Sequence, residues 1–553
     1  MLSQPISRHG EGETRRRGDA SSPSPRLPRV TVSPLLRVAI LAIAAISLAC
    51  GSKPIDPRTV IPADALIYLE SSDLGNTLAA IVDNPKFKQL AKSKPDVSAL
   101  RGVKVSVAVT GFETSEQSVT EENAVLSFRP RFVAVAETNA WGWQTTSFVE
   151  NKLGEFVNEA YGGEVELDKT PRKDGQYYVW TSQDGSKKAY ALQQGSLVYF
   201  GNDESAIERC LAVARGEAES IAKSSKITEG ERLAFGYISP EGVGQIANIA
   251  GVTLAMGASE EGEVKSFIAT VLPQLLRNSV KDMTWTATRT DAGIEDKLIV
   301  RLDDESARVF NETLIPAADR SGEIADFVPA EFATATRYVI RDPQIAWRSL
   351  LLTTRKKTDD TSGALIIAFS GSLFEPYGVE NAEAFLSSVG SPILTVKPTG
   401  DDDEVAVIAP VKDAAKIRSS LAKEIDFAAP PEMQFGAEFR RSKDGEVGVG
   451  IGGDTIVAGE TGTVLKCLEA KQARQNTELR QAFAGSDAVA TTVATDSDSL
   501  AKIVELLSER KNENERVVLT YRTETRFNVN GLERRTTSDF GLIGSLLERI
   551  HSE

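Results

Sequence analysis

Three short motifs carry residue types that could do chemistry, and the first of them pairs a serine with a lysine. Ser420 and Lys423 have the S-x-x-K spacing of serine acyl-transfer enzymes, in which the serine lies at the start of a helix. Here both residues fall within residues 413–425, whose amphipathic pattern predicts one continuous helix with Ser420 in its middle. The K-T-G partner motif is absent from the sequence. We therefore expect an ordinary helix and no serine nucleophile.

The other two motifs are a glycine-rich run and an acidic run. Gly448–Gly453 matches the G-x-G-x-x-G pattern of nucleotide-binding turns, but such a turn must lead into a helix. The residues that follow, T455-I-V-A, predict another strand, so a β-hairpin is the favoured interpretation. Asp401–Glu404 could supply oxygen ligands to calcium, yet its place before a predicted strand favours a solvated turn. We predict no cofactor and no metal site.

Histidine is almost missing, which removes much of the usual catalytic chemistry. The two histidines, His9 and His551, lie close to the two ends of the 553-residue chain. Ser-His pairs, Cys-His pairs and most zinc sites are therefore excluded from the folded body. The 78 acidic residues leave carboxylate pairs for glycoside cleavage open, but no spacing marks one, and we assign no catalytic residue. The formal net charge of -15 argues against a nucleic-acid partner.

Two cysteines and two tryptophans each leave an alternative open. Cys210 and Cys467 fall on or beside the apolar face of predicted helices, which favours small buried side chains. In an exported protein, a disulfide between them is the alternative. Trp141 and Trp143 could stack on a glycan, but their place at a strand–helix junction favours packing in the core or in a hydrophobic staple.

Cys50 is the residue to which the sequence assigns a specific chemical fate. It ends an apolar run of 13 residues, Val38–Cys50, which is shorter than the roughly 20 residues of a membrane span. The run fits a secretory signal, and its end, small residues before the cysteine with Gly51 and Ser52 after it, resembles a bacterial lipoprotein signal. In that family the cysteine is lipidated and becomes the first residue. An ordinary cleaved signal is the alternative.

The sequence predicts a leader, a tether and a folded body, in that order. Residues 1–49 are expected to be a disordered n-region followed by the signal peptide, and residues 50–60 form a proline-containing tether. After the tether, β-type segments such as residues 61–70 alternate with amphipathic helical patterns such as residues 203–215. Many hairpins with helices between sheet segments indicate an α+β protein with a largely antiparallel sheet.

The pattern begins again near residue 328, which predicts a tandem duplication. The stretch from Val328 to Asp342 repeats the stretch from Ile61 to Asp73, with two extra residues. Further matches follow in the same order, and the pairs are Pro62 and Pro329, Tyr68 and Tyr338, Asp73 and Asp342, Asp184 and Asp444, Gly195 and Gly453, Cys210 and Cys467, and Gly293 and Gly531. We therefore predict two similar domains, residues 61–318 and 325–553, each a largely antiparallel sheet covered by helices. The first copy is longer, and its extra length is expected near residues 250–279.

These repeated motifs are similar to those of a family of uncharacterised bacterial extracytoplasmic proteins. The resemblance rests on the Pro-Ala-Asp opening at residue 62, the Asp184-Gly185 hairpin, the strand Gly195–Gly201 and the helix that carries Cys210. It implies a location outside the cytoplasm, and it brings no established activity and no catalytic residues.

The sequence therefore favours a non-enzymatic protein of the bacterial cell envelope that binds a partner or acts as a scaffold. Its expected contacts are the membrane, through a lipid on Cys50, and an envelope protein or glycan. An envelope hydrolase that uses carboxylates or a Ser/Lys pair is the alternative. Gly51 stands where an aspartate marks inner-membrane retention in some bacteria, so the outer membrane or another periplasm-facing position is favoured.

Overall fold

The computed structural model of the protein describes residues 54–552 apart from residues 121–122, 228–229, 258–261, 319–321, 400–403, 428, 474–475 and 513. Cys50, the predicted leader and most of the predicted acidic turn, Asp401–Asp403, lie outside the described residues. Across the described ranges, no helix is both long and apolar enough to cross a membrane.

The chain consists of two successive halves that are built from similar strands and helices. The strands of the first half are β1 (Ile67–Ser71), β2 (Lys104–Thr120), β3 (Asn123–Glu137), β4 (Val165–Arg172), β5 (Gly175–Ser182), β6 (Lys188–Gln194), β7 (Leu197–Gly201), β8 (Ala234–Ile238), β9 (Val280–Thr290) and β10 (Gly293–Leu302). Its helices are η2 (Pro57–Val60), α2 (Leu74–Val82), α3 (Pro85–Leu90), η3 (Ser98–Leu100), α4 (Gly142–Ser147), the π-helix η4 (Phe148–Leu153), α5 (Gly154–Tyr161), α6 (Glu204–Ala214), η5 (Ile221–Lys223), α7 (Pro240–Gly257), α8 (Gly262–Ser279) and α9 (Asp304–Thr313).

The second half repeats the order of strands, with a longer connection between its first two strands, residues 339–392. Its strands are β11 (Thr334–Tyr338), β12 (Ile393–Lys397), β13 (Ala406–Pro410), β14 (Glu432–Gln434), β15 (Ala437–Arg441), β16 (Val447–Gly452), β17 (Thr455–Glu460), β18 (Ala490–Asp496), β19 (Leu519–Asn528) and β20 (Gly531–Ser538). Its helices are η6 (Glu323–Phe327), α10 (Pro343–Lys356), α11 (Asp360–Phe369), η7 (Ser372–Tyr377), α12 (Ala382–Ser388), α13 (Ala414–Ser420), α14 (Thr461–Ala473), α15 (Thr477–Phe483), α16 (Ser499–Leu507) and α17 (Gly541–Ser552).

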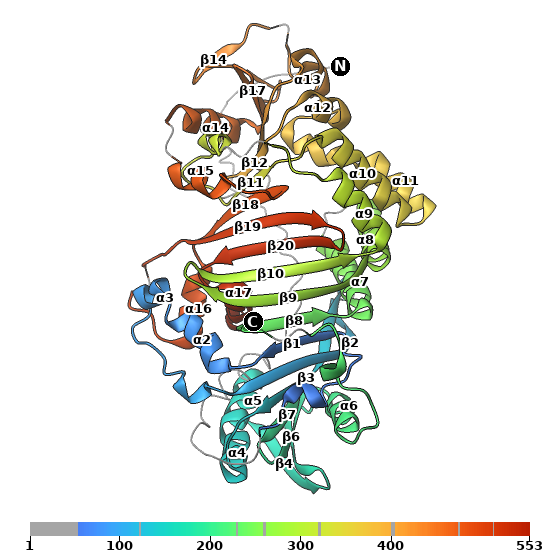
Figure 1. The fold of residues 1–553 in the computed structure, drawn as a ribbon, viewed down its shortest axis with the longest axis vertical. Helices are drawn as coiled ribbons and strands as arrows, with labels where there is room; N and C mark the ends of the chain where they lie inside the picture. Colours follow the sequence, from blue (N-terminus) through green and yellow to red (C-terminus); the bar gives the residue numbers. More distant parts are fainter. Residues whose placement is uncertain are drawn as a thin grey trace, which may run out of the picture.

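Within the described residues, one antiparallel sheet of 20 strands runs through both halves. The order in the first half is β4-β5-β6-β7-β3-β2-β1-β8-β9-β10. The second half has the equivalent order, β14-β15-β16-β17-β13-β12-β11-β18-β19-β20. The last strands of the two halves, β10 and β20, pair with each other and join the halves (Figure 1). The α+β class with a largely antiparallel sheet is confirmed.

Equivalent residues begin equivalent helices and turns in the two halves. Asp73 caps α2 and Asp342 caps α10, and each carboxylate accepts a hydrogen bond from the backbone N–H three residues later. Asp184 and Asp444 accept a backbone N–H two residues later in matching hairpin turns. These turns and caps depend on local hydrogen bonds, which explains why they were visible in the sequence.

One of the predicted equivalences, Tyr68 with Tyr338, is wrong. The strands β1 and β11 each have five residues, and each lies between the second and eighth strands of its half. Tyr68 is the second residue of β1, whereas Tyr338 is the last residue of β11. The two extra residues of the second copy therefore follow the strand, before the helix cap, and do not precede the tyrosine.

The two halves share their core as well as their sheet. The helix α9 of the first half packs on β19 and β20, where the rings of Phe310 and Phe527 lie 5.7 Å apart. In return, α16 and α17 pack on the first half, and Leu500 and Phe540 belong to the same hydrophobic cluster as Leu78. The sheet therefore continues across the predicted boundary between residues 318 and 325.

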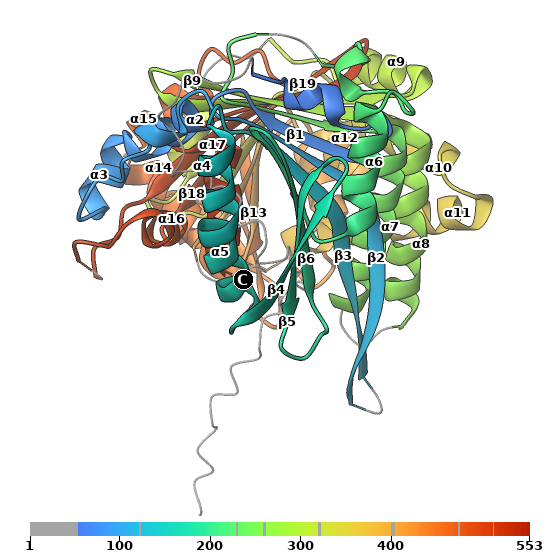
Figure 2. The same ribbon diagram turned by 90° about the horizontal axis from the view of Figure 1, so that it is seen from below.

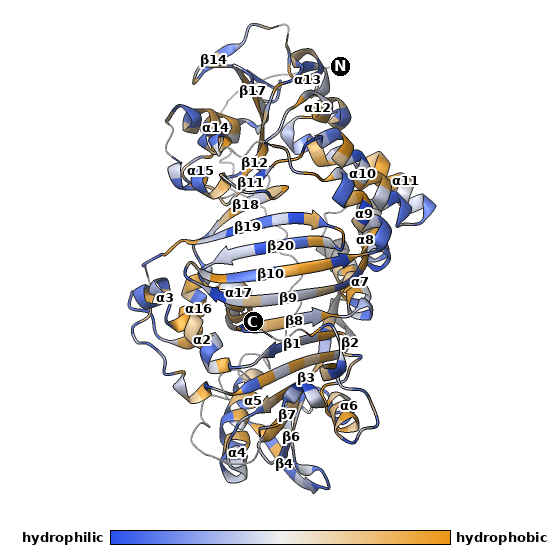
Figure 3. Ribbon diagram, viewed as in Figure 1, coloured by the Kyte–Doolittle hydropathy of each residue, from blue (hydrophilic) through white to orange (hydrophobic). Residues whose placement is uncertain are grey.

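The helices of the central region gather on one side of the sheet. Figure 2 shows α7, α8, α16 and α17 on the same side of β9 and β19, and Figure 1 shows β9, β10, β20 and β19 from the opposite side. The strands seen there carry many hydrophilic residues (Figure 3). Between β8 and β9 the first half has the two helices α7 and α8, where the second half has α16 alone, which confirms the predicted position of the extra length.

Asp296 joins the halves and predicts a pH effect on stability. Its carboxylate accepts hydrogen bonds from Trp285 Nε1 at 2.8 Å and from the backbone N–H of Leu542 at 2.7 Å. Burial raises the pKa of Asp296 from 3.8 to about 6. Because the folded state then holds the proton more tightly, the stability contributed by that proton is lost as the pH rises from about 4 to about 6.

The Asp296→Asn variant removes this titration. We expect the free energy of unfolding of the native protein to fall relative to that of the variant between about pH 4 and 7, by roughly 3 kcal/mol. Urea unfolding of both proteins at several pH values measures the difference. Parallel pH profiles would contradict the raised pKa.

Candidate functional site

The predicted Ser420–Lys423 motif does not form a catalytic pair. Ser420 is the last residue of α13, is buried, and donates its hydroxyl to the carbonyl oxygen of Ile417 at 2.7 Å. The Lys423 side chain is 87% exposed and lies 3.4 Å from Glu380. The expected continuous helix through residue 425 is wrong, because Leu421 has an extended backbone and bridges to Val379.

The glycine-rich run forms a hairpin strand, as predicted. Gly448–Gly452 lies in β16, and β17 follows it directly. A Cβ atom at Gly450 would lie 2.7 Å from Leu468 Cδ1, so the glycine lets α14 pack closely on the strand. The run lets a helix pack on the sheet, and a strand, not a helix, follows it directly.

Cys210 and Cys467 are free and buried, each in the hydrophobic cluster of its own half. The alternative disulfide between them is therefore wrong. Burial raises the pKa of each thiol to about 12. We expect Cys210 and Cys467 of the native protein to be unreactive toward Ellman's reagent near neutral pH, and both to react in the denatured protein. Rapid reaction of native Cys210 or Cys467 would contradict this burial.

Trp141 and Trp143 lie on the surface, so the favoured interpretation of core packing was wrong. Trp141 caps α4 and is 50% exposed, and Trp143 is 72% exposed. Glycan stacking at these rings stays a prediction.

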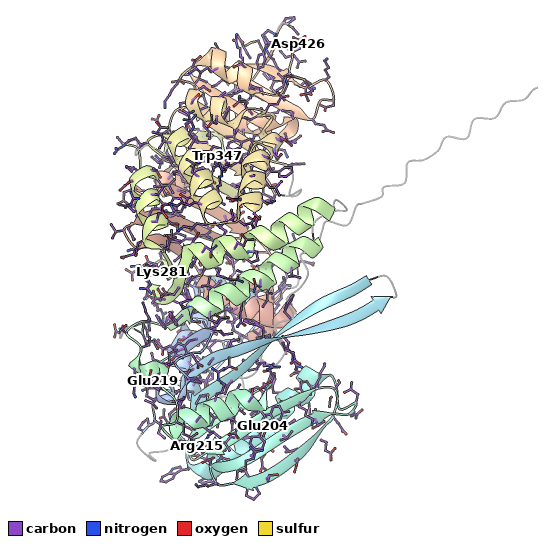
Figure 4. The ribbon with its side chains drawn as sticks, turned by 90° about the vertical axis from the view of Figure 1, so that its right-hand side faces the viewer. Glu204, Arg215, Glu219, Lys281, Trp347 and Asp426 are labelled. Carbon is purple, nitrogen blue, oxygen red and sulfur yellow. The ribbon has the colours of Figure 1, made fainter. Side chains whose placement is uncertain are left out.

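Exposed apolar side chains gather on α10, α11 and η7. Such clusters are typical of interaction surfaces. The large exposed residues there are Ile345, Leu352, Leu365, Ile367, Phe369 and Leu373. Figure 4 shows this region around Trp347, between Asp426 at one end of the molecule and Glu204 and Arg215 near the other end.

A polar pocket of about 170 Å³ lies in the first half, where η2 and the segment before β8 meet the end of β1. The strand β1 is held between β2 and β8, so alternate side chains of the three strands face the same side. Glu70 of β1 and Ser106 of β2 are paired across the ladder and reach the pocket from that side. The pocket is lined by Asp56, Pro57, Arg58, Glu70, Ser71, Ser72, Lys104, Val105, Ser106, Gly230 and Arg232.

Glu70 is the centre of the hydrogen bonds in the pocket. Arg232 donates to one carboxylate oxygen of Glu70, and the Tyr68 hydroxyl donates to the other at 2.6 Å. Arg58 Nε lies 3.9 Å from the same second oxygen. The side chains of Glu70 and Arg232 are each 9% exposed. Burial and then the charge of Glu70 raise the pKa of Tyr68, so its hydroxyl stays neutral and keeps donating.

A second carboxylate, Asp56, is held in the same way. Arg58 Nε donates to both of its oxygens, at 3.1 and 2.9 Å. Burial alone would raise the pKa of Asp56, but the hydrogen bonds from Arg58 and the charges of Arg58 and Lys104 outweigh burial and lower it. The Lys104 ammonium itself makes no hydrogen bond or ion pair with any described residue. The pocket therefore holds two paired carboxylates, two arginines and one further cation.

The second half has different residues at the equivalent positions. In the matching ladder, Arg337 of β11 pairs with Leu394 of β12, where Glu70 pairs with Ser106 in the first half. Leu394 is fully buried in a hydrophobic cluster. The residues that replace Tyr68, Glu70 and Ser106 are thus Ala335, Arg337 and Leu394.

This arrangement is suited to holding a charged ligand. The nearest hydroxyl partner of Ser106 is Tyr68, at 3.0 Å, and this pairing does not activate the serine as a nucleophile. Glu70 and Asp56 each accept hydrogen bonds from a guanidinium. For Asp56 these bonds lower the pKa, which weakens this carboxylate as a proton acceptor.

Sequence reasoning missed this pocket, although part of its signal was present. The alternation in I67-Y-L-E70 places Tyr68 and Glu70 on one face of a strand, and a buried glutamate there requires a partner. Which strand and which loop supply that partner follows from strand pairing across distant parts of the chain.

No family model matches the chain, and no curated protein matches it. Two solved structures of TP0453 are similar in part. Crystal form IV has 12% identity over 47% of this chain and 85% of that chain, with a TM-score of 0.23. Crystal form I has 12% identity over 45% of this chain and 80% of that chain, with a TM-score of 0.22. Similarity at this level assigns no family.

Proposed function

We propose that this protein is a lipid-anchored component of the bacterial cell envelope, periplasm-facing or at the outer membrane, that binds a ligand or partner and catalyses no reaction. The anchor is the lipidated Cys50. The predicted tether, residues 50–60, is shorter than expected, because Pro57–Val60 form η2 and Val60 is buried in the core of the first half. The single observation that carries the binding role is the pairing of both pocket carboxylates, Asp56 and Glu70, with arginines. Carboxylates held in this way fix the position of the cations that can face a ligand.

The alternative, an envelope hydrolase, has less support. The Ser/Lys route required Ser420 and Lys423 to meet, and Ser420 instead donates to the backbone. A hydrolase based on carboxylates requires one acid with a raised pKa beside a charged one. In the pocket, the pKa of Asp56 is lowered.

The tether brings the pocket close to the proposed anchor. Asp56, which lines the pocket, is six residues after Cys50. Six residues of fully extended chain reach at most about 20 Å. A lipid on Cys50 would therefore keep the pocket near the membrane surface, where a membrane-associated ligand or partner is concentrated.

Crosslinking in intact cells, followed by purification of the protein from membranes, tests the proposed function. We expect a discrete crosslinked partner or a retained small molecule, together with an N-terminus that begins at a lipid-modified Cys50 in mass spectrometry. A free, unmodified N-terminus beyond Cys50 would refute the anchor. Turnover of an extracted envelope component by the purified protein would refute the non-enzymatic role.

A further inference from the structure

We infer that the pocket beside η2 binds an oxyanion, a phosphate or carboxylate group, which Lys104 contacts directly while Arg58 and Arg232 supply the surrounding positive charge. This inference names the chemical class of the ligand in the proposed function. The suggestion that the ligand comes from the membrane rests on that proposed function.

The charge of the pocket favours an anion. Three cations, Arg58, Lys104 and Arg232, line it together with two carboxylates, Asp56 and Glu70. The local balance is therefore positive in a chain whose formal net charge is -15. Because like charges repel, an anion in solution would be excluded from most of this surface and attracted to this pocket.

Lys104 is the pocket cation for which the described part of the chain offers no hydrogen bond or ion pair, although its charge acts on Asp56. It is the first residue of β2, is half-buried, and makes no ion pair with the residues that the structure describes. An ammonium held at the wall of a small pocket gains a charge-assisted hydrogen bond when an oxyanion enters. The serines Ser71, Ser72 and Ser106 also line the pocket with hydroxyl groups that can donate to such an anion.

Comparison of the two halves indicates that the polar pocket is a specific feature of the first half. The equivalent ladder in the second half pairs Arg337 with Leu394, and Leu394 packs in a hydrophobic cluster. The same fold is thus stable with an apolar residue where Ser106 stands. Burial of polar groups is unfavourable unless each is paired, so the network around Glu70 is not required by the fold.

The size of the pocket limits what enters it. Its volume of about 170 Å³ is below the roughly 300–1,000 Å³ of sites that enclose a whole drug-sized ligand. It accommodates one phosphate or carboxylate group, while the rest of the ligand lies outside. The membrane-proximal position of Asp56 makes a lipid headgroup one source of that phosphate, and a soluble oxyanion is the other.

Thermal unfolding of the full lipidated protein in neutral detergent micelles tests the inference. The soluble probes are inorganic phosphate, acetate and uncharged glycerol, each at constant ionic strength, and the lipid probe is phosphatidylglycerol added to the micelles. A ligand that binds the folded state raises the unfolding temperature. Lys104→Met is the test variant, and Lys188→Met is its matched control, because Lys188 is also the first residue of a strand, β6, and lies outside the pocket.

We expect phosphate or acetate to raise the unfolding temperature of the native protein and of Lys188→Met, with glycerol inactive. Lys104→Met should bind the anion about tenfold more weakly, as expected for loss of one charged hydrogen bond. A rise with phosphatidylglycerol alone, lost in Lys104→Met, also supports the inference and assigns the headgroup as source. No rise with any anion, or equal weakening in both variants, overturns the inference. The N-terminal mass and the crosslinked partner would still decide the proposed function.

Discussion

Replacement of Cys50 by serine is expected to abolish lipid attachment completely. The thioether that joins a diacylglyceryl group to a lipoprotein needs the sulfur of this residue, and a serine hydroxyl is a far weaker nucleophile than a thiol near neutral pH. Metabolic labelling with an alkyne-bearing fatty acid measures the effect. The native protein should carry the label, and Cys50→Ser should carry none.

A control for this experiment changes the signal without touching the sulfur. Ser47 stands where leucine is commoner in lipoprotein signals, so Ser47→Leu should keep the label at the native level or above it. Label that remains in Cys50→Ser would show that the lipid, if any, is attached elsewhere. Of the three cysteines, Cys210 and Cys467 are both buried in the folded protein. Label on Cys50 can therefore be told apart from label at the other two.

The second large effect is expected at Arg232, where the change is predicted to act on stability. Arg232 and Glu70 form a pair whose side chains are each 9% exposed. Removal of one partner from a buried ion pair destabilises a protein by about 3–5 kcal/mol, because the remaining charge is left without compensation. Glu70 would keep its hydrogen bond from Tyr68 and the nearby Arg58, so we expect Arg232→Met to lower the free energy of unfolding by about 2–3 kcal/mol.

Two further variants separate the buried charge from general effects of arginine removal. Arg308 and Glu312 form a surface pair with side chains 62% and 59% exposed, so Arg308→Met should change stability by less than about 1 kcal/mol. Glu70→Gln combined with Arg232→Met removes both charges and should recover a large part of the loss. Urea unfolding measures all three. An Arg232→Met protein as stable as Arg308→Met would refute a buried, coupled pair.

Much of the fold could be predicted because its signals are local. Asp73 and Asp342 before their helices and Asp184-Gly185 and Asp444-Gly445 between their strands act within a few residues, so their hydrogen bonds can be read from spacing alone. The errors arose where distant parts decide. Trp141 and Trp143 are 50% and 72% exposed, because burial depends on which distant elements pack beside them, and helix 413–425 ends at Ser420, where Leu421 bridges to Val379.

The sequence by itself determined the α+β class, the repeated order of elements and the proposed fate of Cys50, because each depends on residue types at short spacing. Only the tertiary structure decided that β10 and β20 join the halves into one sheet and that α16 and α17 pack on the first half. It also decided the pocket, since Glu70, Ser106 and Arg232 come together through the pairing of β1 with β2 and β8. The physical reason is that a strand can pair with segments far away in the sequence. The alternation of apolar and polar residues within one strand does not identify the strand beside it.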